Sequence, residues 1–373
     1  MKKVFLLFIV CSLLLSSLSG CVQNSTPETN NTLAATQPAT ETTAPSTEPP
    51  TEPPTEPPTE PPTEPTEPPE FSIKLSFVGD VMLANLKNQN KANNFNDYAK
   101  KNPPEYFLEK VKHFFLEDDF TVVNLENVLT DRDLPPKEKD HDPAYWYYSQ
   151  TANTKILTSS GVEAVSLSNN HTNDYGSAGK KDTVDAVKNA GLEYGDDGRM
   201  IVYEKNGFKI AVICHGLWAS YQADSIAKIL KKAQETSDFQ IVYYHGGTQN
   251  EHAPEDWRVE ASRKLVDAGA DLVLGNHPLV LQPMEIYKDV EILYSLGNFC
   301  YGGKSKPENR TIIYQIELTV DKESLALVES QSIITPCYVY TGDVNNFQPA
   351  PIEDPDEIAK VFQFLCGDRE SPK

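Results

Sequence analysis

The chain has 373 residues and a net charge of −21, from 33 lysine and arginine residues against 54 aspartate and glutamate residues, a length that allows one large domain or two small ones. Its hydrophobic content of 39% is too low for a protein with many membrane spans. The acidic balance argues against nucleic acid as a partner, because phosphate binding requires clustered lysine and arginine.

The first 20 residues have the pattern of a secreted protein's leader. A positively charged start precedes an apolar run over 4–15, which is shorter than the ~20 residues that span a bilayer. The sequence Leu-Ser-Gly-Cys then ends at Cys21 and resembles the lipobox of bacterial lipoproteins, in which the cysteine is lipidated and becomes the new N-terminus. We therefore expect a lipoprotein signal peptide over 1–20 and an anchor on the outer side of the bacterial cell membrane. The alternative is an ordinary secretory leader with an incidental cysteine.

Residues 21–70 are rich in threonine, glutamate and proline and end in Thr-Glu-Pro-Pro repeats. Residues 22–70 hold 9 of the 54 acidic residues and 14 of the 28 prolines, but no lysine or arginine. Such a segment cannot bury enough apolar surface to form a core. It is predicted to be a disordered, semi-rigid linker between the anchor and the rest of the chain.

Apolar β-rich segments and helical segments alternate in the remainder. In chain order, we predict strand 73–78, helix 104–115, strands 120–123 and 164–167, helix 177–190, strand 210–214, helix 225–234, strand 239–244, helix 255–268, and strands 272–274 and 292–296. An antiparallel pair over 312–320 and 325–334 and a helix over 356–365 follow. The pattern predicts an α/β domain over 71–340 and a C-terminal extension with a helix over 341–373.

Polar side chains gather where these strands end. The residues that follow the strands are Gly79-Asp80, Asn124-Leu125-Glu126, Ser168-Asn169-Asn170-His171, His245-Gly246-Gly247, Asn276-His277 and Gly297-Asn298. A single histidine after a strand is more often an ordinary loop residue, so only the joint occurrence is informative. Because ligands bind outside the carboxyl ends of strands in α/β sheets, we expect these segments to converge. Their oxygen and nitrogen donors suit a divalent metal such as Mn, Fe, Zn or Mg.

These motifs, in this order, resemble those of a known family. They are Val78-Gly79-Asp80-Val81-Met82, Asn124-Leu125-Glu126-Asn127, the run 168–176, His245-Gly246-Gly247, Gly269-Ala270-Asp271 with His277-Pro278, and the run 294–299. The chain resembles the CapA family of capsule or poly-γ-glutamate biosynthesis proteins, a branch of the calcineurin-like metallophosphoesterases. The resemblance implies a four-layer α/β/β/α sandwich. It also implies a role in making, anchoring or trimming an anionic cell-surface polymer together with other capsule synthesis proteins.

The same resemblance implies roles for single residues. The positions that match metal ligands are Asp80, Glu126, Asn170, His245 and His277. His171 matches the catalytic histidine, and Asn298 belongs to a loop of the site. Two metals about 3.5 to 4 Å apart can stabilise both the attacking and the leaving oxygen. A histidine that binds no metal can exchange a proton with the reacting group.

The sequence departs from the phosphoesterase pattern at the second metal position. Met82 and Leu279 stand where histidines are usual, and Gln249 stands where the family tends to have a glutamate. One metal position therefore keeps a full set of ligands: Glu126, Asn170, His245 and His277. The other keeps only Asp80 and Glu126. We expect one tight metal site and a second, weaker one.

Three functions stay open at this stage. The first is a metal-dependent hydrolase or transferase of the capsule polymer, acting on an amide or a phosphoester bond. The second is a non-catalytic, polymer-binding scaffold with a degraded metal site. The third is a phosphatase acting on nucleotides or lipid phosphates, which the missing histidines disfavour. Lys304, Lys306 and Arg310 follow the last motif and are candidates for holding a polyanion.

Overall fold

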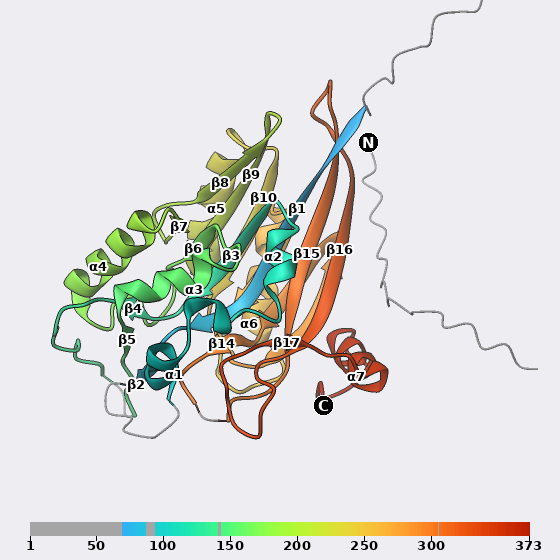
Figure 1. Cartoon of the computed structure of the whole chain (residues 1–373). Helices are drawn as coiled ribbons and strands as arrows, with labels where there is room; N and C mark the ends of the chain where they lie inside the picture. The colour runs from blue at the N-terminus through green and yellow to red at the C-terminus, as the bar shows by residue number, and fades with distance from the viewer. Residues whose placement is uncertain (1–68, 87–93, 141–142, 305) are drawn as a thin grey trace, which may run out of the picture. The chain divides into compact units, whose positions relative to one another are not determined.

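Two β-sheets packed face to face form the centre of the molecule (Figure 1). The computed structural model describes residues 69–86, 94–140, 143–304 and 306–373. The predicted signal peptide over 1–20, the predicted lipid anchor at Cys21 and the linker up to residue 68 lie outside the described residues. Among the residues that are described, no helix combines the length and the apolar character needed to cross a membrane.

The first sheet has the strand order β17-β16-β15-β1-β3-β6-β7, with β14 paired to β1. Its strands are β1 (Glu70–Met82), β3 (Phe120–Leu125), β6 (Ala164–Ser166), β7 (Glu193–Gly195), β14 (Asn298–Tyr301), β15 (Thr311–Asp321), β16 (Leu327–Tyr338) and β17 (Ala350–Pro351). The part built from β1, β3, β6 and β7 is parallel, whereas β15, β16 and β17 add an antiparallel extension.

The second sheet has the order β12-β13-β11-β10-β9-β8. Its strands are β8 (Ile201–Lys205), β9 (Phe208–Gly216), β10 (Phe239–His245), β11 (Leu272–Asn276), β12 (Leu281–Tyr287) and β13 (Val290–Leu296). The four central strands are parallel and the two edge strands are antiparallel. A small separate sheet contains β2 (Asn85–Leu86), β4 (Val128–Leu129) and β5 (Tyr147–Ser149).

Helices cover the outer face of each sheet. The helices are α1 (Phe95–Lys101), α2 (Lys112–Leu116), α3 (Thr154–Thr158), α4 (Gly176–Asn189), α5 (Gln222–Ala233), α6 (Asp256–Asp267) and α7 (Pro355–Leu365), with short 3₁₀ turns η1 (Pro104–Tyr106) and η2 (Thr151–Asn153). Helices α1 to α4 share an apolar cluster with the first sheet, and α5 and α6 share another with the second sheet.

Alternating residues of the central strands explain the four layers. Phe77 and Tyr243 point into the core between the sheets, whereas Val78 and Val242 point to the helices outside. Strands buried on both faces must be apolar at nearly every position, which is how these segments read in the sequence. The predicted α/β/β/α sandwich is therefore confirmed.

The predicted strands and most predicted helices lie where expected. The segment 104–115 differs, because it forms η1 and then α2 instead of one continuous helix. Val111 has φ −122° and ψ −11°, which lies outside the helical region and separates the two turns.

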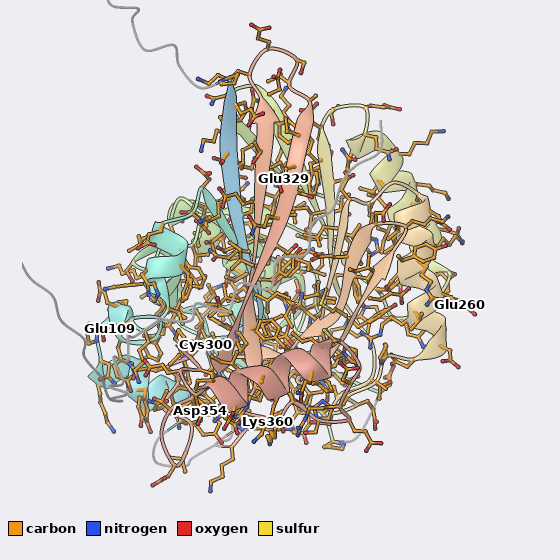
Figure 2. All side chains as sticks on the ribbon, turned by 90° about the vertical axis from the view of Figure 1, so that its right-hand side faces the viewer. Glu109, Glu260, Cys300, Glu329, Asp354 and Lys360 are labelled. Atoms are coloured by element: carbon orange, nitrogen blue, oxygen red, sulfur yellow. The ribbon has the colours of Figure 1, made fainter. Side chains whose placement is uncertain are left out.

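Helix α7 packs against the core between the two sheets. The Asp354 side chain accepts hydrogen bonds from the backbone N–H groups of Asp356 and Glu357, so it caps the start of the helix. Its residues Val361, Phe364 and Leu365 belong to the core cluster between the sheets. Figure 2, where Asp354 and Lys360 mark the helix, shows it lying across the lower end of the sheets. The C-terminal segment thus contributes to the stability of the sandwich.

Replacement of Phe364 tests this contribution. The side chain is 1% exposed, so Phe364→Ala leaves a cavity and should lower the free energy of unfolding by about 3–5 kcal/mol. Urea unfolding of the chain provides the measurement. Exposed Val328, on strand β16, gives a control because Val328→Ala should change the stability by less than about 0.5 kcal/mol. A similar small effect for Phe364→Ala would show that α7 is not part of the core.

Two half-buried acids near the start of β3 make stability depend on pH. Both acids accept hydrogen bonds from Thr121. Glu163 accepts one from the backbone N–H (2.7 Å), and Asp118 accepts one from the Thr121 hydroxyl (2.7 Å). Burial raises the pKa of Asp118 to about 6 and that of Glu163 to about 7. Because both pKa values lie above those of the unfolded chain, the folded state binds these protons more tightly.

The unfolding free energy should therefore rise as the pH falls from about 7 to about 4.5. Glu163→Gln, which keeps the acceptor oxygen for Thr121, should flatten that rise. Exposed Glu235 offers the matched control, since Glu235→Gln changes the net charge equally. Equal pH profiles for the two variants would show that overall charge repulsion, and not the buried pair, causes the dependence.

Candidate metal centre

Both sheets send polar side chains to one end of the sandwich. Glu126 directly follows β3, and Asn170 lies in the loop after β6, so both belong to the first sheet. His245 is the last residue of β10, and His277 directly follows β11, so both belong to the second sheet. These strands run parallel within their sheets, so their carboxyl ends meet at the same edge, as predicted.

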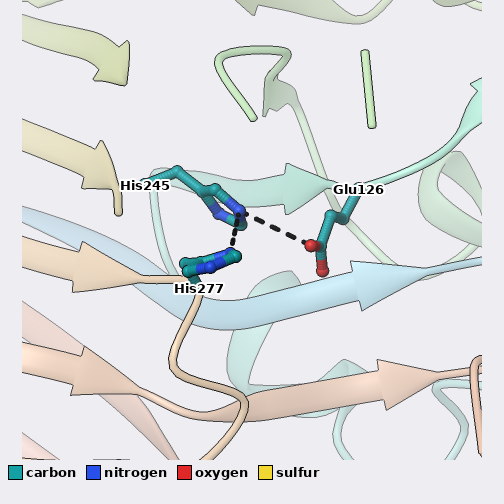
Figure 3. A group of neighbouring side chains, drawn as sticks. All are labelled: Glu126, His245 and His277. Atoms are coloured by element: carbon teal, nitrogen blue, oxygen red, sulfur yellow. Dashed lines mark hydrogen bonds and ion pairs between the residues drawn. The ribbon is translucent and has the colours of Figure 1, made fainter. Parts of the chain in front are cut away.

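Four donor atoms lie close together at this edge, and Figure 3 shows three of the side chains that carry them, those of Glu126, His245 and His277. The Nε2 atom of His245 lies 2.8 Å from Asn170 Oδ1, 3.0 Å from His277 Nδ1 and 3.5 Å from Glu126 Oε1. Ligand atoms at about 2.1 Å from one ion lie about 3.0 to 3.4 Å apart in octahedral to tetrahedral geometry. The spacing of these atoms therefore fits a single cation, and Glu126, His245 and His277 form a group that can hold a divalent metal.

The Glu126 carboxylate supports this fit independently. Its side chain is fully buried, and neither of its oxygens has a hydrogen-bond partner among the described residues. Burial, together with the negative charge of Asp80, raises the pKa of Glu126. A buried carboxylate without hydrogen bonds is costly by several kcal/mol, and a bound cation would offset that cost.

Asp80 lies behind His245 and not among the donor atoms around Nε2. Its Oδ1 is 3.4 Å from Nδ1 of His245 and accepts a hydrogen bond from Asn124 (2.7 Å), while its Oδ2 accepts one from the backbone N–H of His277. Burial opposes a charge on His245, but the Asp80 and Glu126 carboxylates raise its pKa to about 9. In this structure Asp80 orients His245 and fixes the backbone of His277.

His171 stands beside the four donors and is not one of them. Its Nε2 atom lies 3.9 Å from Glu126 Oε1, and its Nδ1 atom lies 2.8 Å from Asp174 Oδ2. The edge of the ring meets the ring of Tyr147 at 4.7 Å between centroids. A histidine whose Nε2 faces the site without being a ligand is placed to transfer protons.

A cavity of about 910 Å³ opens beside His171 and Glu126. Its other lining residues include three lysines, three tyrosines and two amide side chains: Lys137, Lys139, Lys304, Tyr145, Tyr147, Tyr301, Gln249 and Asn250. Gln249 and Leu279, where the sequence departs from the phosphoesterase pattern, both lie on this wall. The cavity is therefore continuous with the donor group, and its lining carries both the lysines and the acids Glu138, Asp140 and Asp174.

The loop after β11 is held in a strained backbone conformation. His277 has φ +100° and Leu279 has φ +66°, values that residues with side chains rarely adopt. Asn298, the predicted site-loop residue, donates a hydrogen bond from Nδ2 to the carbonyl oxygen of Leu279 (2.9 Å) and pairs with Asp80 between strands β14 and β1. Asn298 thus holds the loop that presents His277, and strain of this kind is common at functional sites.

Sequence reasoning missed Trp218, which covers the imidazoles from the other side. Its ring lies 4.9 Å from that of His277 and 5.5 Å from that of His245. The backbone beside it requires glycine at 246, because a Cβ there would lie 1.8 Å from the carbonyl oxygen of Leu217. No motif in the sequence links Trp218 to these histidines, since the contact depends on how the loop after β9 folds back.

We expect the chain to bind about one tight divalent ion, such as Mn²⁺. Glu126→Gln replaces a charged ligand by a neutral amide, and His245→Ala removes a donor atom. Each should therefore weaken binding more than the about 10- to 100-fold that is usual for loss of a supporting partner. Metal analysis after dialysis gives the stoichiometry. Titration with Mn²⁺ should quench Trp218 fluorescence, and Trp218→Phe should remove that signal while Trp257→Phe, in α6, should keep it.

His252 provides the matched control for loss of a histidine. Its Nδ1 lies 3.0 Å from the carbonyl oxygen of Leu281, and its ring packs on Phe364, away from the donor group. His252→Ala should leave the metal content unchanged. Two tightly bound ions per chain, or none after remetallation, would contradict a single tight site.

Comparison with known proteins agrees with the resemblance seen in the sequence. Two relatives are "Capsule biosynthesis protein CapA" of Bacillus anthracis and "PGA biosynthesis protein CapA" of Bacillus subtilis. The first is 27% identical over 256 residues, covering 61% of this chain and 60% of the relative. The second is 27% identical over 251 residues, covering 61% of this chain and 63% of the relative. The chain thus spans less than two thirds of the length of either protein.

A crystal structure described as a novel phosphatase from Mycoplasma pneumoniae covers 71% of this chain and 94% of its own, with 15% identity and a TM-score of 0.42. The family model of the bacterial capsule synthesis protein PGA_cap matches residues 74–302, which include all of the donor residues described above. The chain therefore belongs to the PGA_cap family of bacterial capsule synthesis proteins.

Proposed function

We propose that this chain is a metal-dependent hydrolase or transferase that acts on an anionic capsule polymer of the poly-γ-glutamate type. The observation that carries the proposal is the buried Glu126 carboxylate. It has no hydrogen bond among the described residues, and it lies with three further donors beside His171 at the wall of a cavity. The family description and the names of the Bacillus relatives support a role in capsule and poly-glutamate synthesis.

Different residues of the chain would bind the metal and transfer protons. Glu126, Asn170, His245 and His277 would hold the tight metal, and Asp80 with Glu126 would hold a second, weaker one. A bound divalent cation supplies a Lewis acid that polarises a carbonyl or phosphoryl oxygen. His171 presents Nε2 at the cavity wall, where it can exchange a proton with the reacting group.

The cavity walls suit a polyanion. The chain as a whole is strongly acidic, with a net charge of −21, so an anionic polymer needs a local positive surface. Lys137 and Lys304 provide positive charge in the cavity lining, beside the acids Glu138 and Asp140, while Lys139 is paired with Asp174. Of the tyrosines in the lining, Tyr145 is exposed and could contact the polymer backbone, whereas Tyr147 and Tyr301 are buried.

The N-terminal sequence supports a place at the cell envelope. A lipid on Cys21 would anchor the chain outside the bacterial membrane, and the proline-rich linker would hold the sandwich away from it. This location would place the site near the polymer and near other capsule synthesis proteins.

A non-catalytic, polymer-binding scaffold is the second candidate. The observation in its favour is that Met82 and Leu279, both buried, stand where a second metal would need histidines. In the structure Asp80 is also engaged by Asn124 and the His277 backbone. A scaffold would bind the polymer without cleaving it, whereas an enzyme would turn it over, so an activity assay distinguishes the two functions.

Residues 69–373, loaded with Mn²⁺, should cleave poly-γ-glutamate or a phosphodiester. His171→Ala should lower kcat about 10²- to 10⁴-fold because it removes the group that exchanges protons with the substrate, while the metal content stays the same. Release of shortened polymer, followed by chromatography, measures the first activity, and release of a chromogenic alcohol measures the second. A wild-type chain that is inert on both substrates but binds the polymer would establish the scaffold function instead.

A further inference from the structure

The Asp174 carboxylate lies directly behind His171 and is shielded from water. Its Oδ2 atom lies 2.8 Å from Nδ1 of His171 and also accepts the backbone N–H of Tyr147 at 2.8 Å. The Asp174 side chain has no exposed surface. One carboxylate oxygen therefore contacts both the imidazole and the strand β5 that borders the cavity.

Lys139 completes this arrangement from a different segment of the chain. Its ammonium group lies 2.6 Å from Oδ1 of Asp174 and donates a hydrogen bond to the carbonyl oxygen of Tyr145 (2.6 Å). The backbone N–H of Lys137 donates to the carbonyl oxygen of Asp174 at 2.8 Å. The segment that carries the cavity lysines is thus tied to the loop of His171 through Asp174.

We propose that Asp174, paired with Lys139, is the positioning residue of His171: it fixes the imidazole with its proton on Nδ1 and its Nε2 directed at the cavity. This inference rests on the proposed function only for its catalytic consequence. An ionised carboxylate can only accept hydrogen bonds, so the imidazole nitrogen next to it must carry the proton. The other nitrogen, 3.9 Å from Glu126 Oε1, is then free to exchange protons with a substrate.

The ion pair between Lys139 and Asp174 strengthens the preference for a proton on Nδ1 of His171. The carboxylate is shielded from water, so its charge depends on the lysine and the hydrogen bonds around it. Lys139 holds one carboxylate oxygen while the other stays against Nδ1 of His171. The local sequence His-Thr-Asn-Asp places the carboxylate three residues after the imidazole, and the turn from His171 to Asp174 brings the two side chains together.

The tautomer of His171 can be measured without substrate or metal. In the full chain labelled with ¹⁵N only at histidine, the ring nitrogens of His171 should show a protonated Nδ1 and an unprotonated Nε2 at mildly alkaline pH. His171→Gln identifies its signals. Asp174→Ala should abolish this single pattern, because no acceptor then selects the nitrogen that carries the proton. Lys139→Met should weaken it while leaving Asp174 in place.

Two control measurements distinguish the loss of His171 positioning from general disruption of the fold. Asp182→Ala removes a carboxylate that contacts Thr130 and Arg132, and it should leave the His171 signals unchanged. Mn²⁺ binding should survive Asp174→Ala, since Asp174 contacts none of the four donor residues in the described structure. In an active chain, Asp174→Ala should lower kcat about 10²- to 10⁴-fold with little change in KM.

A protonated Nε2 in the wild-type chain would overturn the inference even if the Asp174 variant fails to fold. An unchanged tautomer in folded Asp174→Ala would also overturn it. If the chain has no turnover but shows the expected tautomer and its loss in the variant, the proposed enzymatic function fails while the positioning role of Asp174 stands.

Discussion

The burial of the Glu126 carboxylate is the constraint on which the site depends. The group is closed off from water, has no hydrogen-bond partner among the described residues, and has Asp80 as a negative neighbour. Nearby positive charge can come from a proton on His245, whose pKa is raised to about 9, or from a metal. A proton and a metal compete for the same imidazole, so metal affinity must rise with pH. The fold therefore places a negative charge that a cation is needed to balance.

This constraint links the site to the packing of the whole sandwich. Glu126 and Asn170 belong to one sheet and His245 and His277 to the other, so the distance between the sheets sets the spacing of the donor atoms. Any change in that distance would separate the two pairs. Helix α7 packs against the core between the sheets although it lies beyond the residues matched by the family model. Residues far from the metal centre in sequence thus help to define its geometry.

The sequence predicted the parts of this arrangement that depend on local pattern. Apolar runs such as 239–244 predict buried strands. The polar residues that follow these runs could therefore be placed at the carboxyl edge of the sheets from the sequence alone. The antiparallel edge strand β12 was missed, because it contains Pro283 and alternates less regularly than the central strands. The positions of Asp80 behind His245 and of Trp218 over two imidazoles depend on loop conformations and contacts between sheets, which no periodicity reports. Asp174 was visible in the motif 168–176, but its role appears only when Lys139, 35 residues earlier, is placed beside it.

Charge around the cavity suggests how metal and polymer influence each other. The carboxylates of Asp80, Glu126 and Asp174 lie on one side, and only Lys139 among the nearby lysines is paired with one of them in a described contact. The anionic polymer proposed above would pass Lys137 and Lys304 and approach a site that is itself negative in the absence of a metal. A bound divalent cation would offset that negative charge, since an ion is the largest charge in such a site. Because coupling between two ligands is reciprocal, a cation at Glu126 and a polyanion in the cavity must each favour the binding of the other.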